Sequence, residues 1–298
     1  ITGALNLNHL SENKKFGLDL AINYGKDISG VMANSSNFIR TAFSLPPNAP
    51  SLYNDDGSVH WEEWTYSAWD NPIAGIVHRK AMDEGYNLWA NLGLSYQLFS
   101  DLTFKLNTGY THLDREYRAF LSKDQYNPEA QESAEHSSIA TQRDRKSWIL
   151  EPQLVYTKKV GNGTIDGLFG ATFQQNKNMT LSILGTGYIS ESLLGDLSAA
   201  ESTNVDINEI TEYKYNALFA RLGYNYQRKY FLNLTGRRDG SSRFGPNKRF
   251  ANFWAVGGAW IFSEEMAVQH QRSFISFGKL RASYGTTGND QIADYGYL

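Results

Sequence analysis

The chain has 298 residues, and its 28 Lys and Arg are nearly balanced by 31 Asp and Glu. This balance leaves no clustered basic surface and argues against a nucleic-acid partner. Cysteine is absent, which excludes disulfides, thiolate chemistry and cysteine-ligated metal centres, and no run of about 18 apolar residues is present to form a transmembrane helix.

Alternation of apolar and polar side chains at a period of two runs through the sequence. In residues 86–99 every second side chain from Leu88 to Leu98 is apolar, and most of the intervening ones are polar. Because a β-strand turns successive side chains to opposite faces, such a segment has one apolar and one polar side. Strands with the same alternation are predicted at 17–24, 102–107, 165–173, 216–226, 254–262 and 279–284.

The length of these segments separates two kinds of β protein. The longer ones, such as 86–99 and 216–226, run for roughly 9–14 residues, whereas a tilted membrane-spanning strand needs about 9–11 and a globular strand usually has about 5–6. Tyrosines end several apolar faces, as in the aromatic girdle of a membrane barrel: Tyr24, Tyr96, Tyr110, Tyr226 and Tyr284. The alternative is a soluble sandwich with aromatic-rich strands.

The connections between the predicted strands alternate in length. Short ones are expected at Ser11–Lys15, Ser100–Asp101, Gly161–Gly163 and Gln227–Lys229, and long ones at Asp27–Gly85, Asp114–Ser147, Gln175–Glu212 and Arg237–Ala251. This alternation is typical of an outer-membrane barrel with short periplasmic turns and long extracellular loops. The exception is the connection Ser263–Ser276, in which Glu264–Ala267 can form one helical turn.

Two stretches in the last third of the chain resemble a known family. Residues Arg238–Gly245 read RDGSSRFG, and residues Lys279–Asn289 read KLRASYGTTGN. In this order and spacing they resemble the SusC/RagA family of TonB-dependent outer-membrane transporters of Bacteroidetes. The tripeptide Asp70–Pro72 resembles an Asp-Asn-Pro in the family's long external loop. The specific match covers about residues 224–289.

The resemblance implies an all-β fold, an antiparallel transmembrane β-barrel of roughly 22 strands around a plug domain. About ten or eleven strands are visible in residues 1–298, so we expect a single partial β-barrel domain, with the plug domain and the remaining strands outside this chain. The whole protein would import a large nutrient, an oligosaccharide or a peptide, across the outer membrane. Its implied partners are a SusD-like surface lipoprotein as lid, outer-membrane lipid, and the TonB–ExbB–ExbD complex acting on the plug.

The family motifs supply the candidate site residues. In the first motif we expect Asp239-Gly240 to form a tight turn with positive φ at the glycine, and Arg237, Arg238 and Arg243 to surround the Asp239 carboxylate. This structural role is favoured over a contact with substrate or plug. In the second motif the basic side chains are expected to face inward. The motif positions are Arg238, Asp239, Gly240, Ser241, Ser242, Arg243, Phe244, Gly245, Lys279, Arg281, Tyr284, Gly288 and Asn289.

A loop rich in tryptophan is the candidate for contact with a substrate or a lid. Its rings are Trp61, Trp64 and Trp69, and aromatic faces suit both sugar rings and partner surfaces. The alternative is that these rings pack the loop on itself.

No catalytic, cofactor or metal site is predicted. The pairs Glu62-Glu63 and Glu264-Glu265 are sequence neighbours rather than an acid and a base held across a cleft, and the 6 His residues are scattered without metal-ligand spacing. The function that the family resemblance implies is transport without covalent chemistry. Two alternatives are a passive porin-like channel and a secreted, soluble all-β binding or structural protein.

Overall fold

The computed structural model describes residues 1–31, 35–64, 71–266 and 277–293. In this part of the chain ten strands form one sheet in the order β1 to β10, and each neighbouring pair is antiparallel. The predicted all-β antiparallel fold is confirmed. The strands are β1 (Thr2–Leu10), β2 (Phe16–Val31), β3 (Arg79–Phe99), β4 (Leu102–Leu121), β5 (His136–Val160), β6 (Gly163–Tyr188), β7 (Ser202–Tyr226), β8 (Tyr230–Ser241), β9 (Phe250–Trp260) and β10 (Leu280–Gly285).

The helices are short and lie in the connections. They are α1 (Ser35–Ser44), α2 (Ala74–Val77), α3 (Pro128–Gln131) and α4 (Ser263–Met266), with 3₁₀ turns η1 (Lys123–Gln125), η2 (Glu191–Leu193) and η3 (Leu197–Ala199). The helical turn predicted after Ser263 corresponds to α4. Within the described residues, none of these helices has the length and apolar character needed to cross a membrane.

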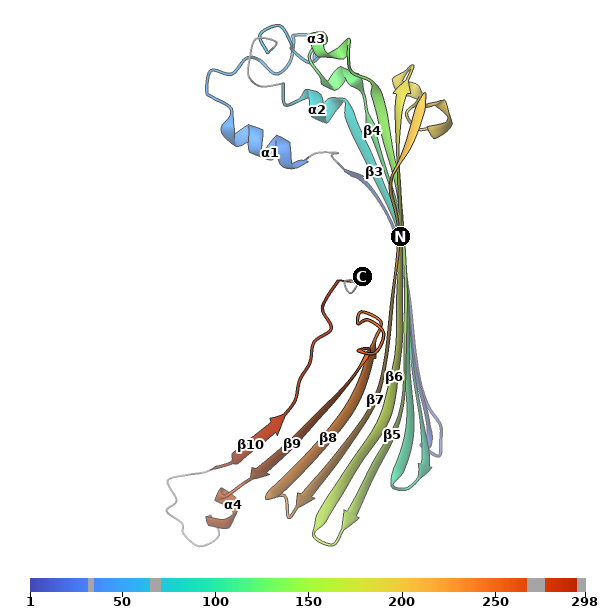
Figure 1. Cartoon of the computed structure of the whole chain (residues 1–298), viewed down its shortest axis with the longest axis vertical. Coiled ribbons are helices and arrows are strands. Elements are labelled where there is room, and N and C mark those ends of the chain that lie inside the picture. Colours follow the sequence, from blue (N-terminus) through green and yellow to red (C-terminus); the bar gives the residue numbers. More distant parts are fainter. Residues whose placement is uncertain (32–34, 65–70, 267–276, 294–298) are drawn as a thin grey trace.

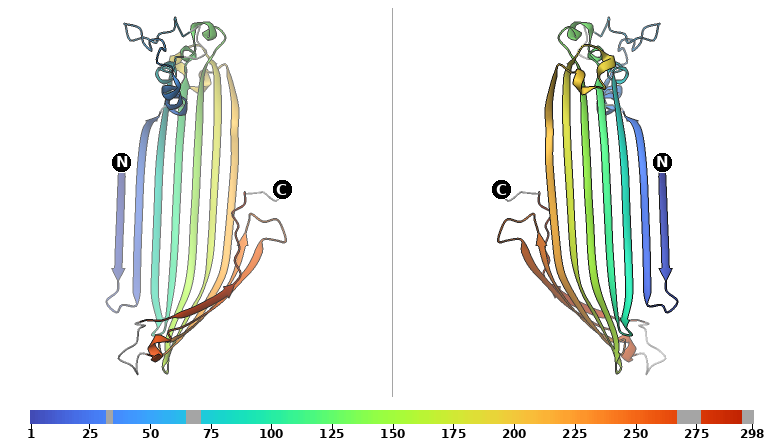
Figure 2. Two further views of the ribbon diagram at one scale, coloured as in Figure 1. Left: turned by 90° about the vertical axis from the view of Figure 1, so that its left-hand side faces the viewer. Right: turned by 90° about the vertical axis from the view of Figure 1, so that its right-hand side faces the viewer.

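The sheet is a tall, curved wall in which consecutive strands lie side by side (Figure 1 and Figure 2). This meander arises because consecutive strands are joined as hairpins. The turns at 11–15, 100–101, 161–162 and 227–229 lie at one end of the wall, at the bottom of Figure 1, and α1 to α3 gather at the other end. The short turns are therefore confirmed where the sequence predicts them.

The hairpin between β7 and β8 shows how such a turn is built. Gln227 and Arg228 both have positive φ, at 52° and 58°, and the N–H of Lys229 donates to the carbonyl of Tyr226 at 3.0 Å. Two successive left-handed residues define a type I′ turn, whose twist matches that of the paired strands.

Several strands are much longer than the sequence predicts. β5, β6 and β7 have 25, 26 and 25 residues, so most of the predicted loops Asp114–Ser147 and Gln175–Glu212 is strand. At about 3.3 Å per residue β6 is roughly 85 Å long, against an apolar band of about 25 Å in a membrane barrel. The prediction failed because polar side chains dominate these extensions, and apolar ones form only short runs such as Met179, Leu181 and Ile183 on β6. β2, β3, β8 and β9 shorten the loops predicted at Asp27–Gly85 and Arg237–Ala251 in the same way.

Between the short turns and the polar extensions, the two faces of the sheet differ in chemistry. The registers place Leu92, Phe169 and Leu222 on one face, in an apolar band that continues from strand to strand between β2 and β9. Phe169 is 51% exposed and Leu222 is 50% exposed, because within the described residues no second layer covers this face. The wall thus has no packed core behind the band and presents it to its surroundings.

Aromatic side chains mark both edges of this apolar band. Tyr110 and Trp148 are direct cross-strand neighbours at the edge toward the polar extensions. At the edge toward the short turns, neighbouring rings lie with their centroids 6.4 to 6.5 Å apart in a row formed by Tyr224, Tyr226, Tyr230 and Trp260. Such paired aromatic edges are typical of the two interfaces of a membrane-spanning barrel.

The connection between β2 and β3 forms a compact unit beyond the polar extensions. The Asn71 side chain is 2% exposed; its amide donates to the carbonyls of Leu52 and His60, and its oxygen accepts the N–H of Ile73. A buried amide with these bonds satisfied ties separate parts of the loop together. Asn71 of the predicted Asp-Asn-Pro tripeptide therefore stabilises the loop, while Asp70 lies outside the described residues.

Candidate functional site on the inner face of the sheet

The face opposite the apolar band is the concave side of the wall. The segment 286–293 continues from the end of β10 along this side in Figure 1, and its residue Asp290 contacts Tyr213 on β7. We call this concave side the inner face and the side with the apolar band the outer face. The two family motifs lie on β8, β10 and the segments that follow these strands, with residues on both faces of the sheet.

The first motif runs along β8 and into the connection that follows. Gly240 pairs within the sheet with Asn216 and with Phe250, so the turn predicted at Asp239-Gly240 is wrong. A Cβ at this position would lie 2.6 Å from the Phe250 ring. Glycine is required here for the close approach of a neighbouring strand's side chain, and not for a left-handed backbone conformation.

The predicted group of three arginines around Asp239 is only partly correct. Arg237 donates to the Asp239 carboxylate at 2.5 Å on the inner face. Arg238 faces the outer side, where its guanidinium lies 5.1 Å from the centre of an aromatic ring. Arg243 lies in the connection after β8, and its guanidinium is 4.4 Å from the centre of the Tyr213 ring. The error has a simple cause, since adjacent residues of one strand point to opposite faces.

Both motifs meet at Asp290, the residue that directly follows the second motif. Its carboxylate accepts hydrogen bonds from the Tyr213 hydroxyl at 2.7 Å and the Ser241 hydroxyl at 3.0 Å. The Arg243 guanidinium donates to the Asp290 carbonyl at 3.2 Å. We call these four residues the Asp290 clasp. It was missed by the sequence analysis because nothing in the local sequence shows that the segment folds back onto β7 and β8.

The structure places the other residues of the second motif on both faces. On the inner face, the Lys279 ammonium lies 5.1 Å from the centre of an aromatic ring, and Arg281 occupies a strand position next to it. Tyr284 is on the outer face, where it makes an edge contact with Trp254 at 5.8 Å. Gly288 lies so close to an aromatic ring of β9 that a Cβ would come within 2.4 Å of it.

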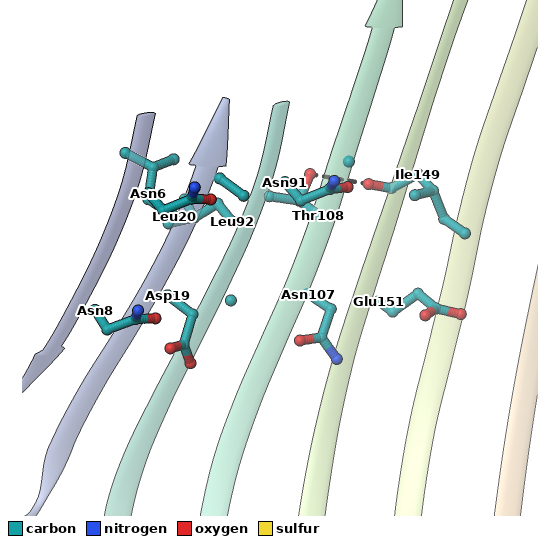
Figure 3. Close-up of a pocket in the computed structure, with 13 residues that line it drawn as sticks. Asn6, Asn8, Asp19, Leu20, Asn91, Leu92, Asn107, Thr108, Ile149 and Glu151 are labelled. Carbon is teal, nitrogen blue, oxygen red and sulfur yellow. Dashed lines mark hydrogen bonds between the residues drawn. The ribbon is translucent and has the colours of Figure 1, made fainter. Parts of the chain in front are cut away.

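A polar hollow lies on the inner face of β1 to β5 (Figure 3). Amides and carboxylates from five consecutive strands surround a volume of about 580 Å³, and they belong to Asn6, Asn8, Asp19, Asn91, Asn107 and Glu151. Gly93 and Gly109 leave space between them. The sequence predicts the polar face of each strand, but the grouping across strands depends on register and was missed.

At least one of the three rings of the tryptophan loop has a structural role. Trp64 is 2% exposed, and its indole N–H donates to the carbonyl of Ser51 at 2.9 Å. Such burial is expected if the ring packs the loop on itself, and it leaves no free face of Trp64 for a substrate. Trp61 is half-buried in the same loop, and Trp69 lies outside the described residues.

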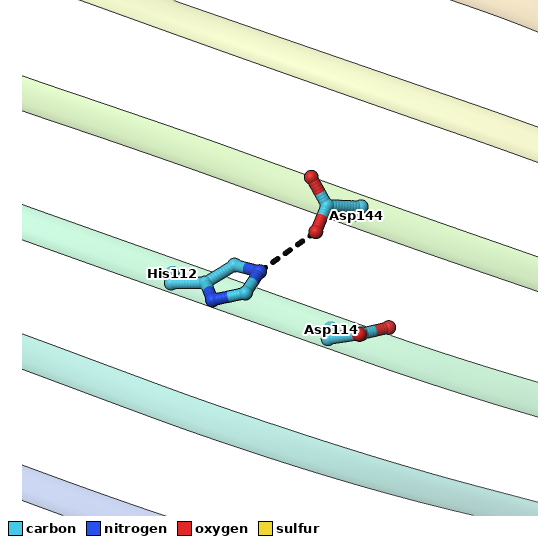
Figure 4. A group of neighbouring side chains, drawn as sticks. All are labelled: His112, Asp114 and Asp144. Atoms are coloured by element: carbon cyan, nitrogen blue, oxygen red, sulfur yellow. Dashed lines mark hydrogen bonds and ion pairs between the residues drawn. The ribbon is translucent and has the colours of Figure 1, made fainter.

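A group of possible metal ligands lies on the outer face of β4 and β5. The ligand atoms of His112, Asp114 and Asp144 are all within 4.8 Å of one another. Figure 4 shows the His112 ring turned toward Asp144, at a contact distance of 2.7 Å, and Lys146 pairs with the same carboxylate at 3.0 Å. Because the Lys146 ammonium already forms an ion pair with the Asp144 carboxylate, we interpret the group as an ion network. Sequence spacing did not reveal it, since strand register brings the residues together.

Comparison with known proteins adds an independent view, although no family model matches the chain. The chain is 28% identical over 290 residues to the TonB-dependent receptor P26 of Formosa agariphila, covering 96% of this chain and 28% of that protein. It is 22% identical over 325 residues to the TonB-dependent receptor SusC of Bacteroides thetaiotaomicron, covering 100% of this chain and 31% of SusC. The chain therefore spans less than a third of the length of these relatives.

The structure is similar to that of the RagAB peptide transporter, with a TM-score of 0.80 and 20% identity over 98% of this chain and 33% of that one. One continuous antiparallel sheet with an apolar outer and a polar inner face thus has the fold of the matched third of the RagAB structure. More narrowly, the resemblance predicted from the two motifs is confirmed. The chain is SusC/RagA-like, because its relatives include SusC and its fold matches RagAB.

Proposed function

We propose that the protein takes part in TonB-dependent import of a large nutrient across the outer membrane, with this chain as part of the barrel wall. The apolar band with aromatic edges on the outer face carries the proposal, because a wall embedded in lipid needs such a band and a polar lumen behind it. The relatives named as TonB-dependent receptors support it.

In this proposal residues 1–298 form one partial barrel domain, and a plug and further strands belong to other parts of the protein. The outer edges of β1 and β10 have no partner strand in the described residues, and unpaired strand edges are not tolerated in lipid. Further strands must therefore close the barrel there. The short turns would face the periplasm, and the polar extensions with α1 to α3 would face the outside.

The proposed cargo is an oligosaccharide or a peptide too large for a passive pore. A lumen that admits such a cargo must be plugged against leakage, so opening it requires work, which the TonB–ExbB–ExbD complex would supply through the plug. A SusD-like lipoprotein would cover the external end as a lid. The similarity to SusC and to the RagAB transporter supports this arrangement, in which no covalent chemistry takes place.

Membrane fractionation and uptake assays test the proposal together. The protein is expected in the outer-membrane fraction, and uptake of its cargo should be lost equally in cells that lack this gene and in cells that lack TonB. Uptake that persists without TonB would identify a passive porin-like channel. Recovery of the protein in the medium without detergent would identify a secreted binding protein instead.

A further inference from the structure

A cavity of about 510 Å³ lies on the inner face between β7, β8 and β9 and the segment 286–293. Rings of Tyr215 and Phe253 from the sheet and of Phe244 from the connection after β8 line it. The Asp290 clasp fixes the segment that forms its far side. The cavity is therefore built by the fold, and it is distinct from the polar hollow on β1 to β5.

The aromatic side chains give the cavity flat apolar surfaces. Tyr213 and Tyr215 are two positions apart on β7, and their rings are nearly parallel, with an interplanar angle of 17° and centroids 6.4 Å apart. Tyr215 and Phe253 are only half-buried, so part of each ring remains open to the cavity. A pyranose ring has an apolar face of matching size, and stacking on aromatic rings buries it.

Hydrogen-bonding side chains lie around these rings. Asp239 and Gln174 line the cavity from the sheet, and Asn289 and Gln291 line it from the returning segment. Arg237 donates to the Asp239 carboxylate at 2.5 Å and so fixes its position. Carboxylates accept and carboxamides both donate and accept hydrogen bonds, which is the set that the hydroxyl groups at the edge of a sugar ring require.

One positive charge at the cavity is not neutralised. Arg249 lines it, and within the described residues its guanidinium takes part in no hydrogen bond or ion pair. The two neighbouring arginines are engaged, since Arg237 bonds the Asp239 carboxylate and Arg243 bonds the main-chain carbonyl of Asp290. A guanidinium without a partner is a strong recognition group for a carboxylate, which it can bind through two parallel hydrogen bonds.

We infer that this cavity binds an acidic saccharide, with a pyranose ring stacked on Tyr215 and Phe253 and a sugar carboxylate paired with Arg249. Asp239 and the neighbouring amides bond the hydroxyl groups. The inference rests on the proposed function in taking the inner face as the route of the cargo. It goes further by naming a carboxylate-bearing glycan as the cargo class and this cavity as a contact.

The test is equilibrium binding to the full-length protein purified in detergent. The probes are trigalacturonate, triglucuronate and trimannuronate, and the methyl ester of each is its uncharged match. At least one acid should bind, and its ester should bind about tenfold to a hundredfold more weakly. Arg249→Gln should weaken binding of the acid by a similar factor and leave the ester unchanged. The matched control Arg228→Gln, in the exposed turn at the other end of the wall, should have no effect.

Four results would overturn the inference. The first is that none of the three acids binds, and the second is that an acid and its ester bind equally. The third is that the Arg249→Gln protein binds the acid as well as the unmodified protein does. The fourth is that tetraglutamate binds in place of the sugars and depends on Arg249, which would make the cavity a peptide site. The assay needs neither TonB nor a membrane. TonB-dependent uptake without such binding would refute this inference alone, and binding without TonB-dependent uptake would refute the proposed function alone.

Discussion

The hydroxyl of Tyr213 on β7 donates a hydrogen bond to the carboxylate of Asp290, at 2.7 Å and across 77 positions of the chain. Together with the bonds that Ser241 and Arg243 of the first motif make to Asp290, it holds the end of the second motif against the first on the inner face. Within the described residues, the returning segment is in no strand, although Thr286 bonds the carbonyl of Trp254. Its position therefore depends strongly on the Asp290 clasp.

Tyr213→Phe is expected to loosen the returning segment while the sheet stays intact. The substitution leaves the Asp290 carboxylate without one of its donors, and loss of a hydrogen bond to a charged group costs about 1.5–3 kcal/mol. Hydrogen exchange of the backbone amides in 286–293 should accelerate accordingly. Tyr156→Phe, on the outer face, serves as the control. Exchange rates that match those of the unmodified protein would show that the clasp does not hold the segment.

Gly240→Ala is expected to destabilise the barrel wall. The added methyl group would meet the Phe250 ring at 2.6 Å and the Asn216 amide oxygen, and overpacking of this kind costs about 1–3 kcal/mol. Gly236→Ala is the matched control on the same strand, because a Cβ there meets nothing within 4 Å. Urea unfolding followed by gel mobility measures both. Equal unfolding midpoints for the two variants would contradict the packing explanation.

Trp64→Ala should unfold the loop unit between β2 and β3 without affecting the sheet. Removal of a buried tryptophan typically costs about 3–5 kcal/mol, and this unit has few other buried side chains in the described residues. Limited proteolysis should then cut within 46–64. Trp61→Ala, at a half-buried position, should have a smaller effect. If Trp64→Ala lowered only ligand affinity and left the cleavage pattern unchanged, the ring would be a binding residue after all.

Much of the fold could be predicted from the sequence, and the failures share one cause. Alternation identifies a strand only where one face is apolar, as around Leu92 and Leu222. In the extensions apolar side chains are few, and charged residues such as Asp144 and Lys146 face outward, so the sequence resembles that of a loop. Cross-strand hydrogen bonds such as that between Thr141 and Ser182 stabilise these parts, and such pairs have no local signal in sequence.

The candidate site was predicted in part. Lys279 and Arg281 lie on the inner face, as the alternation of side chains predicts. The placement of Arg238 was wrong because a turn was assumed where β8 continues. The clasp and the cavity depend on the path of the chain after β10, which sequence periodicity does not record.

The central claim is that the apolar band faces lipid and the opposite face lines an aqueous lumen. These 298 residues contain no cysteine, so Leu222→Cys and Arg221→Cys give single spin-label sites at neighbouring positions of β7 once any cysteine elsewhere in the full-length protein is replaced by serine. In the full-length protein reconstituted in lipid, the label at 222 should collide with dissolved oxygen and avoid a water-soluble nickel chelate, and the label at 221 should show the reverse. Equal nickel accessibility at the two positions, or greater nickel accessibility at 222, would contradict the account.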